Sequence, residues 1–296
     1  MTLFFTELWE RFGYYGMRAL LVLYMTDAAS GGLGINNEIS GAIYGLFTFG
    51  VYALALPGGW IADRVTGQRQ AVFIGGVIIA AGYYSLGLPM VLPGSELWSF
   101  YLGLALVVLG TGLLKPNVSA IVGGLYDEDS PARRDAGFSI FYMGINIGAF
   151  LGPLICGFVG EKVNWHLGFS LAGIGMTLGL IQYAAGRAHL RGVGELPEEA
   201  AAPAMVSSAR KKLVIGLVAV AAAIAGFAGL MSSGTINVSI VEFAQWTGLI
   251  VVVVAAVYFG GIISFGCHSK IERQRVFVIF LLFLGAAMFW SGFEQA

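Results

Sequence analysis

The feature that most constrains this chain is a charged stripe inside an apolar segment at its beginning. Residues 4–25 are rich in Phe, Leu, Trp and Met and are about long enough to cross a bilayer as one helix. At 100° per residue, four polar side chains fall within roughly 40° of one line along that helix. They are Glu7, Arg11, Tyr14 and Arg18, with Glu10 and Tyr15 at the two edges. The opposite side carries Phe5, Leu8, Trp9, Phe12 and Leu23.

A stripe of this kind is costly to expose to lipid. Each ionised side chain near the bilayer centre costs about 2.5–3.5 kcal/mol on insertion scales. The stripe must therefore face the protein interior or a watery cavity, where other helices supply partners. A static ion-pair cluster that only holds helices together is one interpretation. Because buried ion pairs stabilise poorly compared with apolar replacements, the mixture of acids, bases and tyrosines favours a transport pathway.

Composition places the whole chain in the membrane. Hydrophobic residues make up 57% of it and charged residues only 11%, whereas soluble domains carry about 25% charged residues. The long, non-alternating apolar runs exclude barrel strands, so we expect an all-α, polytopic membrane protein. Cys156 and Cys267 lie far apart and indicate neither a disulfide nor a metal site. Nothing in the sequence indicates a removable signal peptide, an organic cofactor or a nucleic-acid partner.

Apolar runs of about 20 residues predict nine spans. They lie near 3–27, 38–62, 70–92, 97–124, 136–160, 165–186, 212–232, 242–266 and 275 to the end. Polar and charged residues interrupted by prolines and alanines fill the gap after the sixth span. We therefore expect four parts: a six-helix bundle over 1–186, a linker over 187–209, an inserted two-helix hairpin over 210–268 and the start of a second bundle over 269–296. The last span ends without a polar flank, so we expect a fragment of a longer protein.

Lysine and arginine in the loops predict the orientation. If loops are taken alternately, one set carries all of the loop cations except Lys162. The N-terminus is therefore expected in the cytoplasm, and the protein in the inner membrane. Three further cations lie at membrane depth: Arg11, Arg18 and Lys115.

The loop between the second and third spans carries the first recognisable motif. Gly58 to Arg69 resembles the loop signature of the major facilitator superfamily, glycine-rich up to Asp63-Arg64 and then Gly-x-Arg69. Small residues allow helices to pack closely. Asp63 can cap a helix or pair with a cation across two halves of a transporter, so that the contact breaks on opening. An ordinary tight turn is the alternative.

Four motifs resemble the proton-dependent oligopeptide transporters of that superfamily, and they span essentially the whole chain. The first span matches ExxERFxYY from Glu7 to Tyr15, and Phe141 to Gly148 resembles FYxxINxG. Gly112 to Asn117 resembles the fourth-helix lysine motif, and Phe289 to Gln295 the start of the seventh transporter helix. The two spans over 212–266 fit the helical pair that bacterial members insert between their halves.

The resemblance implies a proton-coupled symporter that imports di- and tripeptides by alternating access, with a monomer as the functional unit. Arg18 and Lys115 are natural partners of a substrate carboxylate, and the resemblance places Asn146 near the other end of the peptide. An interhelical hydrogen bond is the alternative for Asn146. Aromatic residues would line the site: Tyr14, Tyr15, Tyr52, Tyr142 and Trp290. For Tyr52, packing in the core is the alternative.

Proton coupling requires a titratable group inside the membrane. The histidines all fall at helix ends or in loops, so the role passes to Glu7, Glu10 and Glu294. A carboxylate that loses its cation partner in one conformation takes up a proton there. Glu7 and Glu10 would act with Arg11 and Lys115, and the resemblance suggests that Glu294 also contacts Arg18 and substrate.

Three other function classes were weighed. The same fold could carry another small anion or a drug, nitrate-like or peptidomimetic, but such relatives typically alter the first-helix acids or the fourth-helix lysine, which are intact here. A different facilitator, such as a drug or sugar exporter, would not be expected to carry the four motifs. An intramembrane enzyme would need a Ser–His, HExxH or paired-Asp arrangement, and no histidine lies at membrane depth. We therefore do not expect an enzyme.

Overall fold

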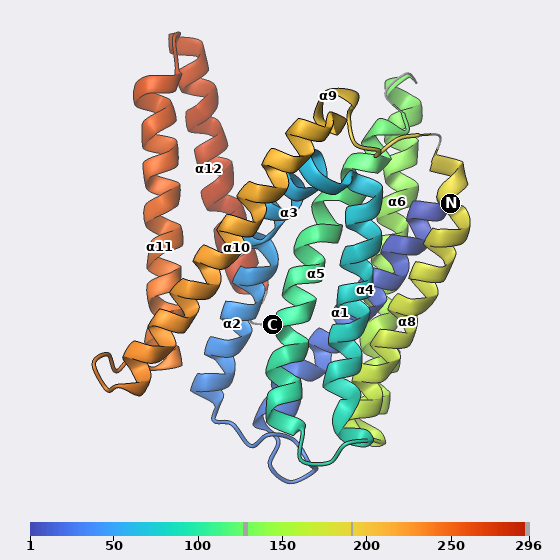
Figure 1. The fold of residues 1–296 in the computed structure, drawn as a ribbon, viewed down its shortest axis with the longest axis vertical. Coiled ribbons are helices and arrows are strands. Elements are labelled where there is room, and N and C mark those ends of the chain that lie inside the picture. The colour runs from blue at the N-terminus through green and yellow to red at the C-terminus, as the bar shows by residue number, and fades with distance from the viewer. Residues whose placement is uncertain (127–129, 191, 294–296) are drawn as a thin grey trace. The chain divides into compact units, whose positions relative to one another are not determined.

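A computed structural model describes residues 1–126, 130–190 and 192–293 (Figure 1). All regular secondary structure in those residues is helical. The chain divides into two compact units, Met1–Asn237 and Val238–Ala296, and each is described by itself.

The first unit holds the long helices that the sequence predicts, several of them continued by short helical turns. Its α-helices are α1 (Thr2–Thr26), α2 (Asn37–Ala53), α3 (Ala55–Ile61), α4 (Gln68–Gly87), α5 (Glu96–Gly124), α6 (Pro131–Gly152), α7 (Phe158–Lys162), α8 (Trp165–Gly186), α9 (Glu198–Ala201) and α10 (Pro203–Ser232). Its other helical turns are η1 (Ala62–Thr66), η2 (Leu88–Met90), η3 (Pro153–Gly157) and η4 (Arg187–Leu190). The second unit consists of α11 (Ile240–Gly261), η5 (Ile262–Gly266) and α12 (Lys270–Phe293).

Length and hydropathy confirm a multi-pass helical membrane protein. Eight helical stretches of the described residues are long and apolar enough to cross a membrane. The 25-residue helix α1 is not one of them because Glu7, Glu10, Arg11 and Arg18 interrupt its apolar character. With α1, the helices correspond to the nine predicted spans.

Three predicted helix starts are wrong by several residues, always in the same direction. The helices α6, α10 and α12 begin at Pro131, Pro203 and Lys270, before the predicted positions 136, 212 and 275. Helix α10 therefore begins inside the predicted linker over 187–209. Apolar runs mark the residues that can lie in the lipid, whereas these three helices extend beyond those residues into polar sequence. Proline at the first position of a helix, as in α6 and α10, signals such a start because its missing N–H needs no partner there.

Glycines set how closely α1 approaches α6. Gly144, Gly148 and Gly152 follow one another at four-residue spacing and therefore lie on one face of α6. A Cβ atom on Gly144 would lie 2.8 Å from the carbonyl oxygen of Phe4, and on Gly148 or Gly152 it would overlap the carbonyl oxygen of Leu8 or Phe12. The two backbones are thus in contact, as in other membrane helix pairs built on small residues.

The remaining contacts of α1 fix the direction of its polar stripe. Its side opposite the stripe packs on α8, where Gly175 and Gly179 accommodate Phe12 and Trp9. Gly13 lies against the ring of Tyr83 in α4. The acid-rich first half of the stripe is therefore buried within the first unit, as the cost of exposing it to lipid requires, whereas Tyr15 and Arg18 are half-buried.

Candidate functional site

The centre of the site is an ion-pair triad in the first half of α1. The Arg11 Nε donates a hydrogen bond to Glu7 Oε1 over 2.7 Å and lies 3.0 Å from Glu10 Oε2. All three residues are buried, with relative exposures of 1%, 0% and 6% for Glu7, Glu10 and Arg11. The structure brings these three side chains together, and their role in proton coupling stays a prediction.

The triad carries an excess of negative charge, and most of its carboxylate oxygens lack a hydrogen bond. Two carboxylates meet one guanidinium, and three of their four oxygens have no hydrogen-bond partner among the described residues: Glu7 Oε2, Glu10 Oε1 and Glu10 Oε2. Buried polar atoms are normally satisfied, so exceptions point to a function or to a missing proton or water. A proton on one carboxylate would remove the excess negative charge and supply a donor.

Lys115 reaches the same region from α5. It lies within electrostatic range of Glu10, and its Nζ sits 4.3 Å from the centre of the Tyr52 ring. A cation at this distance over an aromatic face is attracted by the ring. Tyr52 itself is 61% exposed, so the core-packing alternative for it is wrong. Lys115 thus lies between the buried triad and an open surface.

Further along the stripe, Arg18 and Tyr14 of α1 contact aromatic residues of α2. The Arg18 Nε donates a hydrogen bond to the hydroxyl of Tyr44 in α2, and its guanidinium carbon lies 5.3 Å from the centre of the same ring. Tyr14 stacks on Phe47 of α2, with ring centres 6.3 Å apart, and meets Tyr15 edge-on. The stripe therefore leads from buried acids to a partly open, cationic and aromatic end.

Helix α6 presents a second group of predicted site residues. Tyr142 is 58% exposed, and Asn146, also exposed, donates from its Nδ2 to the backbone carbonyl of Tyr142 over 3.0 Å. Both line a hollow of about 510 Å³ along this face of α6, a volume within the range of small-molecule sites. The hydrogen bond of Asn146 stays within its own helix, so the interhelical alternative does not hold in the described residues.

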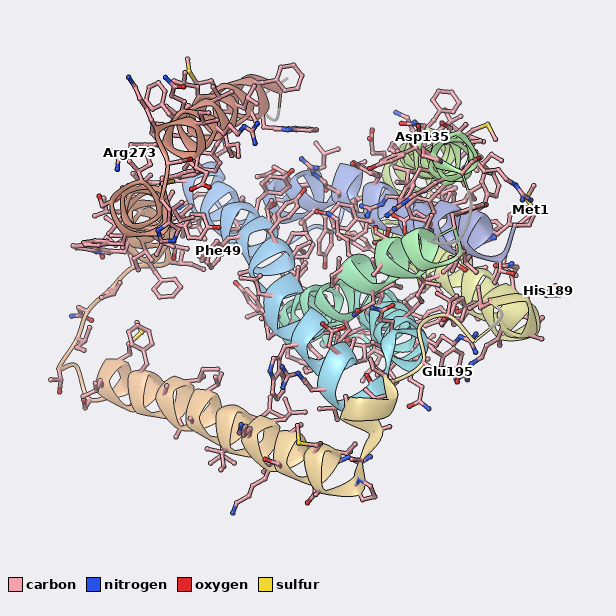
Figure 2. All side chains as sticks on the ribbon, turned by 90° about the horizontal axis from the view of Figure 1, so that it is seen from above. Met1, Phe49, Asp135, His189, Glu195 and Arg273 are labelled. Atoms are coloured by element: carbon pink, nitrogen blue, oxygen red, sulfur yellow. The ribbon has the colours of Figure 1, made fainter. Side chains whose placement is uncertain are left out.

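The loop motif anchors the chain that follows α8. Arg69, which is buried, donates from Nε to the carbonyl oxygen of Val193 over 2.6 Å and from Nη1 to Glu195 Oε1 over 2.8 Å. Glu195 lies in the segment between α8 and α9 (Figure 2). Gly194 accepts a backbone hydrogen bond from Arg69 N. Asp63 and Arg64, within the preceding π-helical turn η1, are exposed. An ordinary tight turn therefore does not explain the contacts that Arg69 makes with the segment after α8.

Two of the predicted site residues, Trp290 and Glu294, belong to the second unit. Trp290 in α12 is 52% exposed. Glu294 lies outside the described residues, so its proposed pairing with Arg18 stays a prediction. The predicted division of the chain into four parts likewise stays a prediction.

Sequence reasoning missed three residues. Tyr44 binds Arg18, Glu195 binds Arg69, and the buried Tyr83 hydroxyl, unpaired among the described residues, lies within electrostatic range of Glu10. Tyr44 lies three residues before Phe47 and eight before Tyr52 on the same apolar helix, where only the three-dimensional contact distinguishes it. Glu195, in contrast, is an acid in a polar segment whose partner is far away in sequence.

Membrane-length helices that bury two acids and an arginine between them are typical of membrane transporters. Comparison with known proteins makes this class more specific. The model of the POT family matches residues 69–296. The chain belongs to the POT family.

Individual relatives agree with this assignment. A di-/tripeptide transporter of Lactococcus lactis subsp. lactis (strain IL1403) is 42% identical over 100% of this chain and 58% of its own length. The peptide transporter YePEPT of Yersinia enterocolitica is 38% identical over 99% of this chain and 57% of its own. The chain thus spans somewhat more than half the length of these relatives.

Solved structures share the fold. A crystal structure of a peptide transporter POT in complex with sulfate matches with a TM-score of 0.84 and 43% identity, over 99% of this chain and 58% of that one. A POT family transporter in complex with 5-aminolevulinic acid matches with a TM-score of 0.83 and 36% identity, over 98% of this chain and 58% of that one.

Proposed function

We propose that this protein imports di- and tripeptides together with protons across the cytoplasmic membrane. The observation that carries the proposal is the buried triad of Glu7, Glu10 and Arg11, with carboxylate oxygens left unpaired in the described residues. In a fixed structural ion pair each carboxylate oxygen would have a hydrogen-bond partner, whereas a proton carrier needs a carboxylate oxygen that can take up a proton. The names of the relatives, di-/tripeptide and peptide transporters, support the substrate class.

A peptide has a carboxylate at one end and an ammonium at the other, with variable side chains between them. Arg18, at the partly open end of the stripe, and Lys115, over the exposed ring of Tyr52, are membrane-depth cations that would hold the carboxylate. Asn146, whose side-chain oxygen accepts hydrogen bonds, would lie near the other end. Exposed aromatic rings tolerate many side chains, so the tyrosines and Trp290 would line the pockets.

The coupling step would take place within the triad. Protonation of Glu10 or Glu7 would loosen its hold on Arg11 and change the field that Lys115 experiences, because the groups are within electrostatic range of one another. Two acids so close titrate as a coupled unit and not as independent sites. Loading of peptide and proton would then permit the change of access, with Asp63, Arg64 and Arg69 of the loop motif in the gating contacts. Glu294 would take part in coupling by pairing with Arg18.

Orientation follows from the loop cations. The end of the bundle that carries Arg64, Arg69 and Lys212 would face the cytoplasm, since positively charged loops stay inside. This end, named here the cation-rich end, holds the N-terminus of α1 as well. One monomer would contain the whole transport path for peptide and proton.

The test is uptake of labelled dialanine into liposomes that contain the full-length protein, with an imposed proton gradient. Accumulation above the equilibrium level, abolished by an uncoupler, is the expected result. Equilibration without accumulation would contradict proton coupling. Transport of 5-aminolevulinic acid or a peptidomimetic with no transport of dialanine would favour the alternative substrate class.

A further inference from the structure

A small cavity lies at the cation-rich end, away from the stripe of α1. Its volume is about 110 Å³, and it is enclosed between the α3–η1 turn and the beginning of α10, both in the first unit. Trp60 and Arg64 line it from one side, and Ser208, Ala209 and Lys212 from the other. Peptide-sized ligands need several hundred Å³, so this cavity cannot be the substrate site.

Charge sets the kind of ligand that fits. Arg64 and Lys212 come from different elements yet line the same space, and none of the described residues that line it is acidic. Both side chains are exposed, and like charges that line one cavity repel each other less when an anion lies between them. Ser208 adds a hydroxyl donor. The lining therefore matches a small anion with several acceptor oxygens, such as a phosphate group.

Exposed apolar side chains lie on both sides of the cavity. Met205, Ser208, Ala209 and Lys212 lie on one face of α10, and the next residue on that face, Ile215, is 58% exposed. Ala209 is the one buried residue of α10. On the other side, Leu56 lies one turn before Trp60 and is 82% exposed. Tryptophan at the rim is typical of the membrane–water interface.

We propose that this cavity binds the headgroup phosphate of an anionic phospholipid. Arg64 and Lys212 hold the phosphate, Ser208 donates to it, and the acyl chains run along the exposed faces of α3 and α10. Basic pockets between membrane helices on the cytoplasmic side take anionic headgroups in this way. The bound lipid holds α10 against the loop motif. Location in the inner leaflet depends on the orientation proposed above, whereas binding itself does not depend on peptide transport.

The test is native mass spectrometry of the purified protein in mild detergent, titrated with phosphatidylglycerol, phosphatidylcholine or inorganic phosphate. Arg64→Gln/Lys212→Gln removes the proposed partners. Arg210→Gln/Lys211→Gln removes the same charge from exposed neighbours on α10 that do not line the cavity. Arg64→Lys/Lys212→Arg keeps the charge and shows whether the site variants still fold.

We expect one tightly held phosphatidylglycerol, with phosphatidylcholine bound at least tenfold more weakly. Its affinity should fall about tenfold or more in the glutamine variant of the cavity and stay unchanged in the other two variants. An equal loss in Arg210→Gln/Lys211→Gln would overturn the proposal, because diffuse charge would then explain binding. Displacement of the lipid by millimolar inorganic phosphate would also overturn it, since the site would then take the free anion.

Discussion

At the scale of single residues, the triad in α1 is held together by one guanidinium shared between two carboxylates. Arg11 Nε is within 3.0 Å of both Glu7 and Glu10. Since one nitrogen cannot satisfy four carboxylate oxygens, the arrangement needs a proton, a water molecule or another cation to complete it. Lys115, over the ring of Tyr52, is the nearest candidate cation from another helix.

The first prediction concerns the substrate carboxylate. Arg18→Ala should weaken binding of a dipeptide by about tenfold or more, because a charge-assisted contact is lost. The same variant should have little effect on the C-terminal amide of that dipeptide. Tyr44→Phe should show a smaller loss, equivalent to about 1 kcal/mol, since it removes a hydrogen bond that orients Arg18.

Binding of both ligands to the wild type and the two variants, by calorimetry or scintillation proximity, provides the measurement. Wild-type protein that binds the dipeptide and its amide equally well would show that the carboxylate role is wrong. A Tyr44→Phe loss as large as that of Arg18→Ala would instead give Tyr44 a direct contact with substrate.

The sequence predicts the composition of this stripe but not all of its partners. Helical periodicity places Glu7, Arg11 and Arg18 on one side, and the membrane requires that side to be enclosed. Which helix encloses it depends on packing between segments far apart in sequence. Tyr44 and Tyr83 therefore emerge only from the structure.

At the scale of helices and loops, two adjacent glycines of the loop motif have opposite surroundings. A Cβ atom on Gly58 would overlap the carbonyl oxygen of Gly112 in α5, whereas on Gly59 it would meet nothing within 4 Å. The motif therefore needs its first glycine for the approach of α3 to α5, and the second glycine has no such role in the described residues.

The second prediction compares Gly58→Ala with Gly59→Ala. Gly58→Ala should lower the thermal unfolding midpoint, because the backbones must separate at a cost of about 1–3 kcal/mol. Gly59→Ala should leave the midpoint unchanged or raise it slightly, since alanine favours the helix over glycine. Thermal unfolding in detergent measures both. Equal losses in the two variants would show that the contact with α5 is not what requires Gly58.

The third prediction concerns the anchoring of the segment after α8. Arg69→Met should make residues 190–197 sensitive to protease, because it removes the hydrogen bond to Val193 as well as the ion pair. Glu195→Gln should have a smaller effect, under about 1 kcal/mol, since Glu195 is largely exposed and surface pairs contribute little. Limited proteolysis of the two variants beside wild type is the measurement. Greater sensitivity in Glu195→Gln than in Arg69→Met would contradict this view.

Helix number and order could be predicted from hydropathy, but helix starts could not. An apolar run ends where charged residues begin, whereas a helix ends where its backbone hydrogen bonds end. Capping residues mark where those backbone hydrogen bonds begin or end. Ser239 and Glu242 form a capping box at the start of α11, with the Ser239 hydroxyl accepting from Glu242 N and the Glu242 carboxylate from Ser239 N.

At the scale of the whole molecule, the fourth prediction is that the insertion is peripheral to transport. None of the residues of α11 is buried, and α10 buries only Ala209. Deletion of residues 210–268, with a flexible linker in their place, should leave peptide uptake largely intact while removing the proposed lipid site. Loss of uptake by a well-folded deletion variant would contradict this prediction.

The arrangement of one bundle against the other is beyond what the sequence predicts. Motifs such as Phe289 to Gln295 identify a segment, but the contacts of Trp290 and Glu294 depend on the position of a whole helix. Charge and hydropathy constrain each helix separately. In the proposed alternating-access cycle the relation between the halves would change, so no single pairing of residues would determine it.

The most direct test of the central claim, that the first-helix acids carry the proton, compares two modes of transport in Glu10→Gln and Glu7→Gln. A glutamine imitates a permanently protonated acid and removes the gain or loss of a proton. Gradient-driven accumulation of dialanine should fall to background in both variants, because the acids act as a coupled unit. Peptide-for-peptide exchange, which needs no net proton movement, should survive.

Both assays are run side by side on liposomes with equal amounts of reconstituted protein. Loss of accumulation with retained exchange is the result that the account predicts. Accumulation equal to wild type in both glutamine variants would contradict it, and would show that Glu7 and Glu10 are structural and that the proton is carried by another group.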